Sequence, residues 1–385
     1  MKRRSQRPSG PRRSARSRGP VRYAVVGLGY IAQAVVLPAF AHARNSRIAA
    51  LVSEDPVKLR KLGDQYGVAR RCAYPQFDAL LRSGEIDAVF IALPNHLHSE
   101  YAILAARAGI HVLCEKPMAT SATECRAMID AARKAGVKLM IAYRLHFERG
   151  NLTAAALVRS GKLGDPRAFT ADFTMQVADE ENIRLKDALG GGTLYDIGIY
   201  CINAARALLR GEPLEVACWT ARKKEKRFRE VEETACALLR FPGERLASFT
   251  CSFGASDVSS YRVIGTRGDL RVEPAFEFAG EIVHHLTIDG RRRERRFPKR
   301  DQFAPELVHF SDCILRDRRP APGGEEGLLD VQIIEALYES ARIGRSVKLD
   351  LSLPHQRPRL SQEMRRPPVR KPALVNASSP SAGGD

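Results

Sequence analysis

The sequence predicts an α/β protein with two domains, a doubly wound parallel sheet followed by an α+β domain with an open, mostly antiparallel sheet. Three observations support this prediction. Apolar runs of strand length alternate with helical segments up to about residue 145, a glycine-rich turn follows the first run, and short β-rich runs with turn signals fill the region after residue 166. With 385 residues, 44% of them hydrophobic, the chain can bury two cores.

The first part of the chain indicates a βαβ repetition. Its predicted strands are nearly continuous apolar runs, as strands buried on both faces of a parallel sheet must be. Two intervening segments indicate helices that end at a glycine, EYAILAARAG at Gly109 and ATECRAMIDAARKAG at Gly136. The predicted strands are VRYAVVG (21–27), RIAALV (47–52), DAVFIAL (87–93), HVLCE (111–115) and KLMIAY (138–143).

The region after residue 166 indicates a mainly antiparallel sheet, because the turn signals PGE, GTRG and DGR separate its later β-rich runs. We expect RRRERR (291–296) at a solvated hairpin. The run EEGLLDVQIIEALYESARIG predicts a last helix that ends at Gly344 and packs on the sheet or back on the first domain. The predicted strands are PRAFTADFTMQV, LEVACWTA, ETACALLRF, RLASFTCSF, SSYRVIGT, DLRVE and EIVHHLTID.

The net charge of +18 is concentrated at the two ends of the chain. Residues 1–22 hold nine Lys/Arg and no acid, and residues 354–385 hold six Lys/Arg against two acids. These Pro-, Ser- and Arg-rich ends cannot bury enough apolar surface to fold, so we predict disordered basic tails at 1–20 and 354–385. Weak contact with nucleic acid or an anionic surface is the less favoured alternative.

The sequence also bears on the compartment. No apolar run reaches the length of a transmembrane helix, and no apolar h-region follows the twin arginines of PRRSARSRG, so we predict neither a membrane span nor export. The eight cysteines form no C-x-x-C pair and lie mostly in apolar segments, which indicates reduced, buried thiols and favours the cytoplasm. No metal-ligand cluster with recognisable spacing appears, so we predict no metal.

A glycine fingerprint follows the first predicted strand and opens a helix. Gly27-Leu28-Gly29-Tyr30-Ile31-Ala32 has the form G-x-G-x-x-A, in which the glycines let the backbone approach a pyrophosphate at a helix N-terminus. The match alone is weak evidence, but the strand before it and the βαβ pattern after it predict a dinucleotide site. We expect the binding domain to span residues 21–145 and the cofactor to contact Gly27, Gly29, Tyr30 and Ile31.

The end of the second predicted strand favours NADP over NAD. An NAD-preferring fold usually has an acid about 20 residues after the fingerprint, where it holds the ribose 2′-OH. Here Ser53 stands at the strand end and Lys58 on the next helix, and a hydroxyl and an ammonium both suit a 2′-phosphate. Glu54 or Asp55 would take the ribose position if the strand ended one residue later, which keeps NAD as the alternative.

Two further motifs end predicted strands, at the edge where sheets of this kind bind ligands. CEKPMA (114–119) closes the fourth strand and offers a lysine near the reacting centre, with an exposed turn lysine as the alternative. PNHLH (94–98) ends the third strand. Because two such motifs end neighbouring strands, an exposed turn lysine without a function is the less favoured interpretation of Lys116. We expect these motifs to bind the cofactor through Pro94, Asn95, His98, Glu115 and Lys116.

The stretch GGGTLYDIGIYCINAARALL (190–209) predicts a helix with one polar face. Thr193 is the expected N-cap, and Asp196, Tyr200 and Asn203 follow at i, i+4 and i+7. The other positions are largely apolar, so the helix is expected to be mostly buried and its polar face needs partners. On this stretch alone, Asp196 and Tyr200 form either a structural hydrogen-bonded pair or part of an active site.

Together these motifs resemble the glucose-fructose oxidoreductase (Gfo/Idh/MocA) family of NAD(P)-dependent sugar dehydrogenases, particularly its glucose-fructose and aldose oxidoreductase branch. The resemblance spans roughly residues 21–350. It implies an N-terminal Rossmann domain and a substrate and dimerisation domain at 146–353, whose sheet face joins a homodimer or homotetramer. It rests on GLGYIAQAVVLPAF, LVSEDPVK, ALPNHLH, CEKPMATS, GGGTLYDIGIYCINAAR and GEEGLLDVQIIEALYESARIGR.

The resemblance implies that Lys116, Asp196 and Tyr200 are catalytic, and Tyr200 matches the glucose-fructose branch because most of the family has His there. A free phenol is a poor base at neutral pH, and an adjacent ammonium favours the phenolate. We therefore expect Lys116 to activate Tyr200 as acid/base, and Asp196 to orient sugar or lysine. Ile183-Arg184 replaces a frequent Trp-Arg pair, which predicts a different sugar subsite. The candidate substrate residues are Arg144, Arg184, Asp196 and Tyr200.

These features predict an NADP-dependent aldose oxidoreductase that oxidises a cyclic sugar at C1 to its lactone, with transfer of the hydride to a second sugar as an extension. One alternative is an enzyme of another carbonyl or diol, such as an anhydrosugar reductase or a dihydrodiol dehydrogenase. Another is a non-catalytic NADP-sensing regulator, against which the retained lysine, aspartate and tyrosine argue. We expect residues 1–20 and 356–385 to be dispensable for catalysis.

Overall fold

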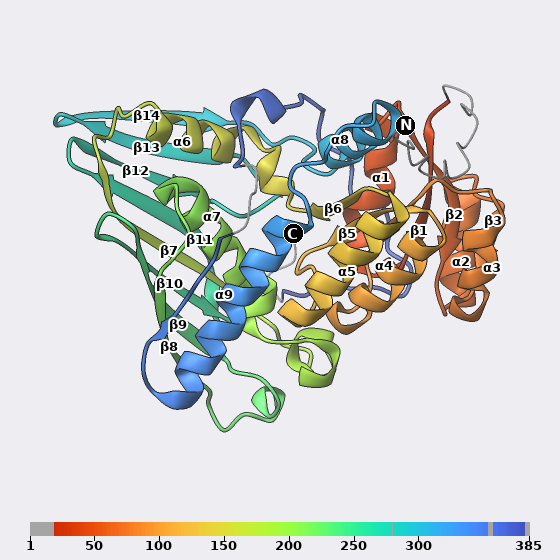
Figure 1. Cartoon of the computed structure of the whole chain (residues 1–385), viewed down its shortest axis with the longest axis horizontal. Helices are drawn as coiled ribbons and strands as arrows, with labels where there is room; N and C mark the ends of the chain where they lie inside the picture. Colours follow the sequence, from red (N-terminus) through yellow and green to blue (C-terminus); the bar gives the residue numbers. More distant parts are fainter. Residues whose placement is uncertain (1–18, 279, 353–356, 382–385) are drawn as a thin grey trace, which may run out of the picture.

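The computed structural model describes residues 19–278, 280–352 and 357–381, which form two sheets with helices packed on them (Figure 1). The parallel sheet has six strands in the order β3-β2-β1-β4-β5-β6, and the second sheet has nine, in the order β14-β13-β12-β11-β7-β10-β9-β8-β15. In the second sheet only β7 and β10 pair in parallel. The predicted α/β fold with a doubly wound sheet and a mostly antiparallel sheet is therefore confirmed.

The strand order of the parallel sheet reverses between β1 and β4, which places a crevice at the carboxyl ends of these strands. The short edge strand β3 was not predicted, because its sequence RRC contains no apolar run. The strands are β1 (Val21–Val26), β2 (Ser46–Val52), β3 (Arg70–Cys72), β4 (Ala88–Ile91), β5 (His111–Glu115) and β6 (Leu139–Ala142). The helices are η1 (Ala32–Val36), α1 (Leu37–Ala39), η2 (Phe40–His42), α2 (Pro56–Gln65), η3 (Tyr74–Gln76), α3 (Phe77–Arg82), η4 (Asn95–Leu97), α4 (His98–Arg107), α5 (Ala122–Ala135) and η5 (Arg144–His146).

The second sheet buries alternate residues of β9 and β10 under helices. The basic run RRRERR lies in a hairpin, as expected, where it forms the edge strand β14, in which only Phe297 is buried. The strands are β7 (Pro166–Gln176), β8 (Glu215–Ala221), β9 (Thr234–Phe241), β10 (Arg245–Ser252), β11 (Gly254–Gly265), β12 (Gly268–Glu273), β13 (Ile282–Ile288), β14 (Arg291–Phe297) and β15 (Val347–Lys348). The helices are α6 (Arg149–Arg159), η6 (Ile183–Leu185), η7 (Asp187–Leu189), η8 (Leu194–Gly198), α7 (Ile199–Leu209), η9 (Lys226–Phe228), α8 (Ala304–Leu315), α9 (Gly324–Ile343) and η10 (Leu360–Gln362).

The last two long helices connect the domains. Helix α9 contacts both β8 and α5, so both packing alternatives left open by the sequence are realised. Helix α8 returns to the Rossmann domain, where the Tyr23 hydroxyl lies 2.8 Å from that of Ser311. Within the described ranges, no helix is long and apolar enough to cross a membrane.

The C-terminal segment differs from the disordered tail that we predict. Residues 357–381 pack against both domains, although η10 is their only helix and they form no strand. Arg366 donates to the carbonyl of His42 at 2.9 Å, and Leu374 and Val375 pack on the core of the Rossmann domain. We predicted disorder from the average composition of residues 354–385, and an average composition does not reveal individual contacts that anchor a segment. The other predicted tail lies almost wholly in residues 1–18, outside the described residues.

Candidate active site

Lys116 follows β5 and reaches the helix of the second domain. Its ammonium donates to the Asp196 carbonyl at 2.8 Å and to Asp196 Oδ1 at 3.1 Å. The same ammonium lies 4.9 Å from the centre of the Tyr200 ring. The two side chains of the ion pair are 13% and 16% exposed, so the pair is largely withdrawn from water. The structure thus brings the three predicted catalytic residues together.

Two arginines border this cluster. Arg184 Nε donates to Asp196 Oδ2 at 2.5 Å, so Asp196 lies between two cations. The Arg144 guanidinium lies 5.0 Å from the centre of the Tyr200 ring and donates to Gln302 Oε1 at 2.5 Å. Both predicted substrate arginines therefore line the site, and no sequence motif pointed to Gln302.

The neighbouring charges of the cluster stabilise the charged forms of Asp196 and Lys116. Burial alone would raise the pKa of Asp196, but Arg184 and Lys116 outweigh it and hold that pKa below its usual range. Burial likewise opposes charge on Lys116, yet Tyr200 and Asp196 raise the pKa of its ammonium. Lys116 therefore stays a cation beside the phenol. Burial raises the pKa of the neighbouring Glu115 to about 7, although Lys116 acts against this.

The helix that carries Asp196 and Tyr200 begins differently from the prediction. Thr193 makes no side-chain cap, and its hydroxyl and backbone N–H both donate to Glu232, at 2.6 Å each. Glu232 comes from the loop before β9, so no local pattern could identify it. A π-helical turn, η8, then precedes α7 and adds a residue to the turn.

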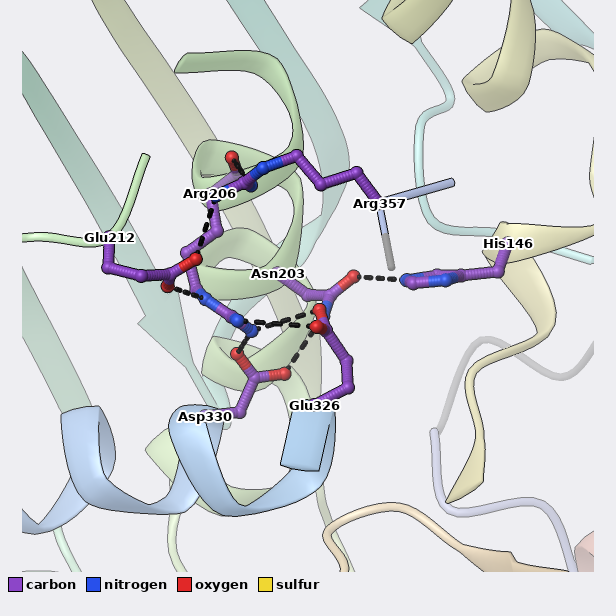
Figure 2. A network of polar contacts seen from close by, with 7 residues as sticks. All are labelled: His146, Asn203, Arg206, Glu212, Glu326, Asp330 and Arg357. Carbon is purple, nitrogen blue, oxygen red and sulfur yellow. Dashed lines mark hydrogen bonds and ion pairs between the residues drawn. The ribbon is translucent and has the colours of Figure 1, made fainter. Parts of the chain in front are cut away.

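Asn203 does not join the polar face with Asp196 and Tyr200. It bonds His146 Nε2 at 2.8 Å and donates to Glu326 and Asp330 of α9 at 2.9 Å each (Figure 2). Arg206 lies beside these acids, fully buried, with its guanidinium 3.0 Å from Glu326 and 2.5 Å from Asp330. This buried ionic network ties α7 to α9 behind the site.

The fingerprint turn has room for a dinucleotide. Gly27 has φ +91°, and a Cβ there would meet the Ala92 carbonyl oxygen at 2.4 Å, so only glycine fits. A Cβ at Gly29 would meet nothing within 4 Å, so the space above the turn is open. Tyr30 and Ile31 begin the helix. The Tyr30 hydroxyl is buried without a hydrogen-bond partner among the described residues, which suits a ligand group at this turn.

The loop after β2 favours the serine over Asp55. β2 ends at Val52, as the NADP interpretation requires, and Ser53 is buried directly after it. Asp55 caps α2, because its carboxylate accepts from the N–H groups of Val57 and Lys58 at 2.8 and 3.1 Å. With that carboxylate engaged in the cap, Ser53 and the Lys58 side chain are our candidates for the 2′-phosphate.

The structure gives two residues of the PNHLH motif, His98 and Asn95, contacts that hold neighbouring loops. His98 is fully buried, and its ring nitrogens bond the carbonyls of Pro117 and Leu93 at 2.8 and 2.9 Å. Asn95 donates to the Gly190 carbonyl at 2.7 Å. These residues hold the lysine turn and the glycine loop in place, so we assign them a positioning role. Pro94 remains a candidate contact at the end of β4. In the described part of the chain, no group of His, Cys, Asp or Glu could hold a metal ion.

Comparison with known proteins agrees with this two-domain fold. Residues 21–143 match the model of the oxidoreductase family with an NAD-binding Rossmann fold, and residues 151–271 match the GFO/IDH/MocA C-terminal domain. The NADP(+) D-xylose 1-dehydrogenase of Haloarcula marismortui is 34% identical over 337 residues, 86% of this chain and 94% of that protein.

Solved structures show the same architecture. A crystal structure of aldose-aldose oxidoreductase from Caulobacter crescentus complexed with glycerol has a TM-score of 0.82 and 41% identity, and the match covers 86% of this chain and 100% of that chain. The 3-ketoreductase KijD10 from Actinomadura kijaniata, in complex with NADP and TDP-benzene, has a TM-score of 0.77 and 27% identity over 84% of this chain and 98% of that chain.

A dinucleotide turn, joined to a lysine at a strand end and to an aspartate and a tyrosine on the helix that faces it, defines an NAD(P)-dependent oxidoreductase. The chain belongs to the GFO/IDH/MocA family, as its motifs predicted. It is an NADP-dependent sugar oxidoreductase that acts on CH–OH groups.

Proposed function

We propose that the enzyme oxidises an aldose at C1 to the lactone, and that it can return the hydride to a second sugar. The observation that carries the proposal is the Lys116 ammonium, which lies between Asp196 and the Tyr200 ring. The names of the xylose dehydrogenase and of the aldose-aldose oxidoreductase support an aldose as the substrate class.

The chemistry of this chain's own residues follows from that cluster. NADP, held by the fingerprint turn and by Ser53 and Lys58, supplies the hydride acceptor when it is bound. As C1 loses its hydrogen with the bonding electron pair, Tyr200 takes the proton of the C1 hydroxyl. Lys116 stabilises the phenolate, and Asp196 keeps Lys116 charged and in place. Arg144 and Arg184 are positioned to hold sugar hydroxyls at the same site.

A screen of aldoses with NADP and NAD, followed by the absorbance of reduced nicotinamide, tests the first step. We expect oxidation of at least one aldose, with NADP preferred. An absence of turnover with every aldose would contradict the proposal and favour the carbonyl or diol enzyme. For the second step, an aldose deuterated at C1 is mixed with a second sugar and catalytic NADP. Deuterium should appear in the reduced second sugar without accumulation of NADPH.

We also infer that the second sheet joins two copies of the chain. Figure 1 shows α6, α7 and α9 on one side of this sheet, and its other side carries no helix of the described chain. Apolar side chains are exposed on its strands, among them Trp219 (62%), Leu238 (51%) and Leu246 (56%).

All eight cysteines are free thiols, which supports a reducing compartment such as the cytoplasm.

A further inference from the structure

The C-terminal segment extends beyond the shared fold. The match to the aldose-aldose oxidoreductase covers all of that chain but only 86% of this one. The part of this chain from β1 to β15, which holds both domains, makes up a similar share of its length. We call the described residues from Arg357 to Asn376 the C-terminal strap.

The strap is anchored first on the second domain. Arg357 donates to Glu212 Oε1 at 2.8 Å and to the Arg206 carbonyl, next to the buried ionic network (Figure 2). Glu363 then pairs with Arg300 at 2.8 Å and Arg149 at 3.4 Å. Figure 1 shows this part, in dark blue, beside α6. The strap therefore starts from a fixed position, far from the fingerprint turn in sequence.

The far end of the strap bonds both parts of the proposed dinucleotide site. The Val375 N–H donates to Gln33 Oε1 at 2.7 Å, and Gln33 Nε2 donates back to the Val375 carbonyl at 2.9 Å. Gln33 is fully buried in the helix that follows the glycine turn. One residue later, Asn376 donates to Asp55 Oδ2 at 2.8 Å, in the loop that we assign to the adenosine ribose.

Lys371 adds positive charge at the same place. Its ammonium lies 5.5 Å from the centre of the Tyr30 ring, whose buried hydroxyl has no partner among the described residues. A pocket of about 480 Å³ borders Lys371 and Val35, and its lining includes Lys299 and Arg300. The lining contains one acid, Asp301, and Arg300 is paired with Glu363, so Lys299 and Lys371 supply the positive charge of this pocket. Clustered cations beside a dinucleotide turn suit the phosphates of a cofactor.

We propose that the strap is part of the NADP site of this enzyme, with Lys371 as a cation for the cofactor phosphates and with Val375 and Asn376 closing the site over its adenosine half. The adenosine diphosphate of a bound dinucleotide extends from the glycine turn to the end of the second strand. The strap is bonded to Gln33 near the glycine turn and to Asp55 near the end of the second strand. It therefore lies across the path by which the adenosine half of the cofactor would leave. This inference rests on the proposed positions of the cofactor residues.

The test measures cofactor release from the full-length chain. Asn376→Asp places a carboxylate against Asp55, so repulsion opens the strap without touching either core. Excess NADP displaces bound NADPH in a stopped-flow fluorescence experiment, and we expect release about threefold to tenfold faster than in the unmodified protein. Ser378→Asp is the matched control, because it adds the same charge at a nearby exposed position and should leave release unchanged.

A second pair of variants tests the phosphate contact. Lys371→Ala should weaken NADPH binding about threefold to tenfold, whereas Arg370→Ala, which removes an exposed cation one residue away, should not. Unchanged release in Asn376→Asp together with unchanged affinity in Lys371→Ala would overturn the proposal. Tighter binding in either variant would overturn it too, since the strap would then compete with the cofactor. The measurement needs no sugar, so its outcome is independent of the aldose screen.

Discussion

In the proposed mechanism, a single ammonium organises the chemistry of this enzyme. Lys116 is largely buried, bonds Asp196 twice and faces the Tyr200 ring. Because Asp196 and Tyr200 raise the pKa of this ammonium, it remains charged through the neutral range, where a phenol needs a cation to act as a base. Removing the cation and removing the phenol should therefore damage the same proton transfer.

Tyr200→Phe should lower kcat by about 10²- to 10⁴-fold while NADPH binding survives, because only the hydroxyl is lost. Lys116→Ala should also lower kcat and shift the limb of the pH-rate profile that Tyr200 controls, the rise toward high pH during oxidation, to higher pH, since the cation that favours phenolate is gone. The double variant should be little worse than either single one. Tyr195→Phe is the control, because its hydroxyl bonds the Thr120 carbonyl at 2.6 Å instead. Near-normal kcat in Tyr200→Phe would make the phenol structural.

The cofactor preference can be tested at one residue as well. Ser53→Asp places a carboxylate at the end of β2, where it should repel a 2′-phosphate and accept from a 2′-OH. We expect the ratio of the Kd values for NADP and NAD to invert in fluorescence titrations. Glu54→Gln, an exposed neighbour, should leave the ratio unchanged. Equal affinity of the unmodified protein for both cofactors would contradict the role of Ser53.

At the scale of elements, buried charges fasten the catalytic helix to α9. Arg206 is fully buried, and the surrounding acids raise its pKa although burial opposes this. Arg206→Met would leave Glu326 and Asp330 buried without their cation, which should cost about 3–5 kcal/mol of unfolding free energy. Arg240→Met, at an exposed pair with Glu215, should leave the unfolding free energy nearly unchanged. Similar losses in urea denaturation of the two variants would contradict the role of the network.

The β13–β14 hairpin carries a pH-sensitive histidine. Burial lowers the pKa of His284 from 6.5 to about 4, and its ring packs 4.5 Å from that of Phe297. Below pH 6.5 the His284 ring is protonated in the unfolded chain, whereas in the folded chain it is protonated only near pH 4. The contribution of neutral His284 to the unfolding free energy is therefore complete above pH 6.5. It is lost as the pH falls toward 4, by at most about 1.4 kcal/mol per pH unit.

His284→Phe should flatten the decrease of unfolding free energy between pH 6.5 and 5, measured by chemical denaturation. His285→Phe alters the exposed neighbour on the other face of β13 and should keep the slope of the unmodified protein. If both variants keep that slope, His284 is not the group responsible.

At the scale of the whole molecule, the uncovered face of the nine-stranded sheet should determine the oligomeric state. We expect a dimer or tetramer at micromolar concentration in size-exclusion chromatography with light scattering. Leu238→Glu on this face should shift the protein toward the monomer, because a carboxylate would be buried unpaired in the interface. Leu315→Glu, at an exposed leucine of α8, should not. A monomeric unmodified protein would contradict the proposed interface.

The sequence by itself determined the two-domain fold and the fingerprint turn, and it singled out Lys116, Asp196 and Tyr200, which the structure brings together. These signals are local: apolar periodicity, a turn that only glycine fits, a lysine at the end of a parallel strand, and two polar residues four positions apart on one helix. Tertiary structure alone decided that Glu232 receives the N–H and hydroxyl of Thr193, that Asn203 joins the buried acids of α9, and that the C-terminal strap reaches Gln33. Each of these contacts joins residues far apart in the chain; Gln33 and Val375, for example, are separated by 342 in residue number. Such contacts leave no periodic pattern in the sequence from which they could be predicted.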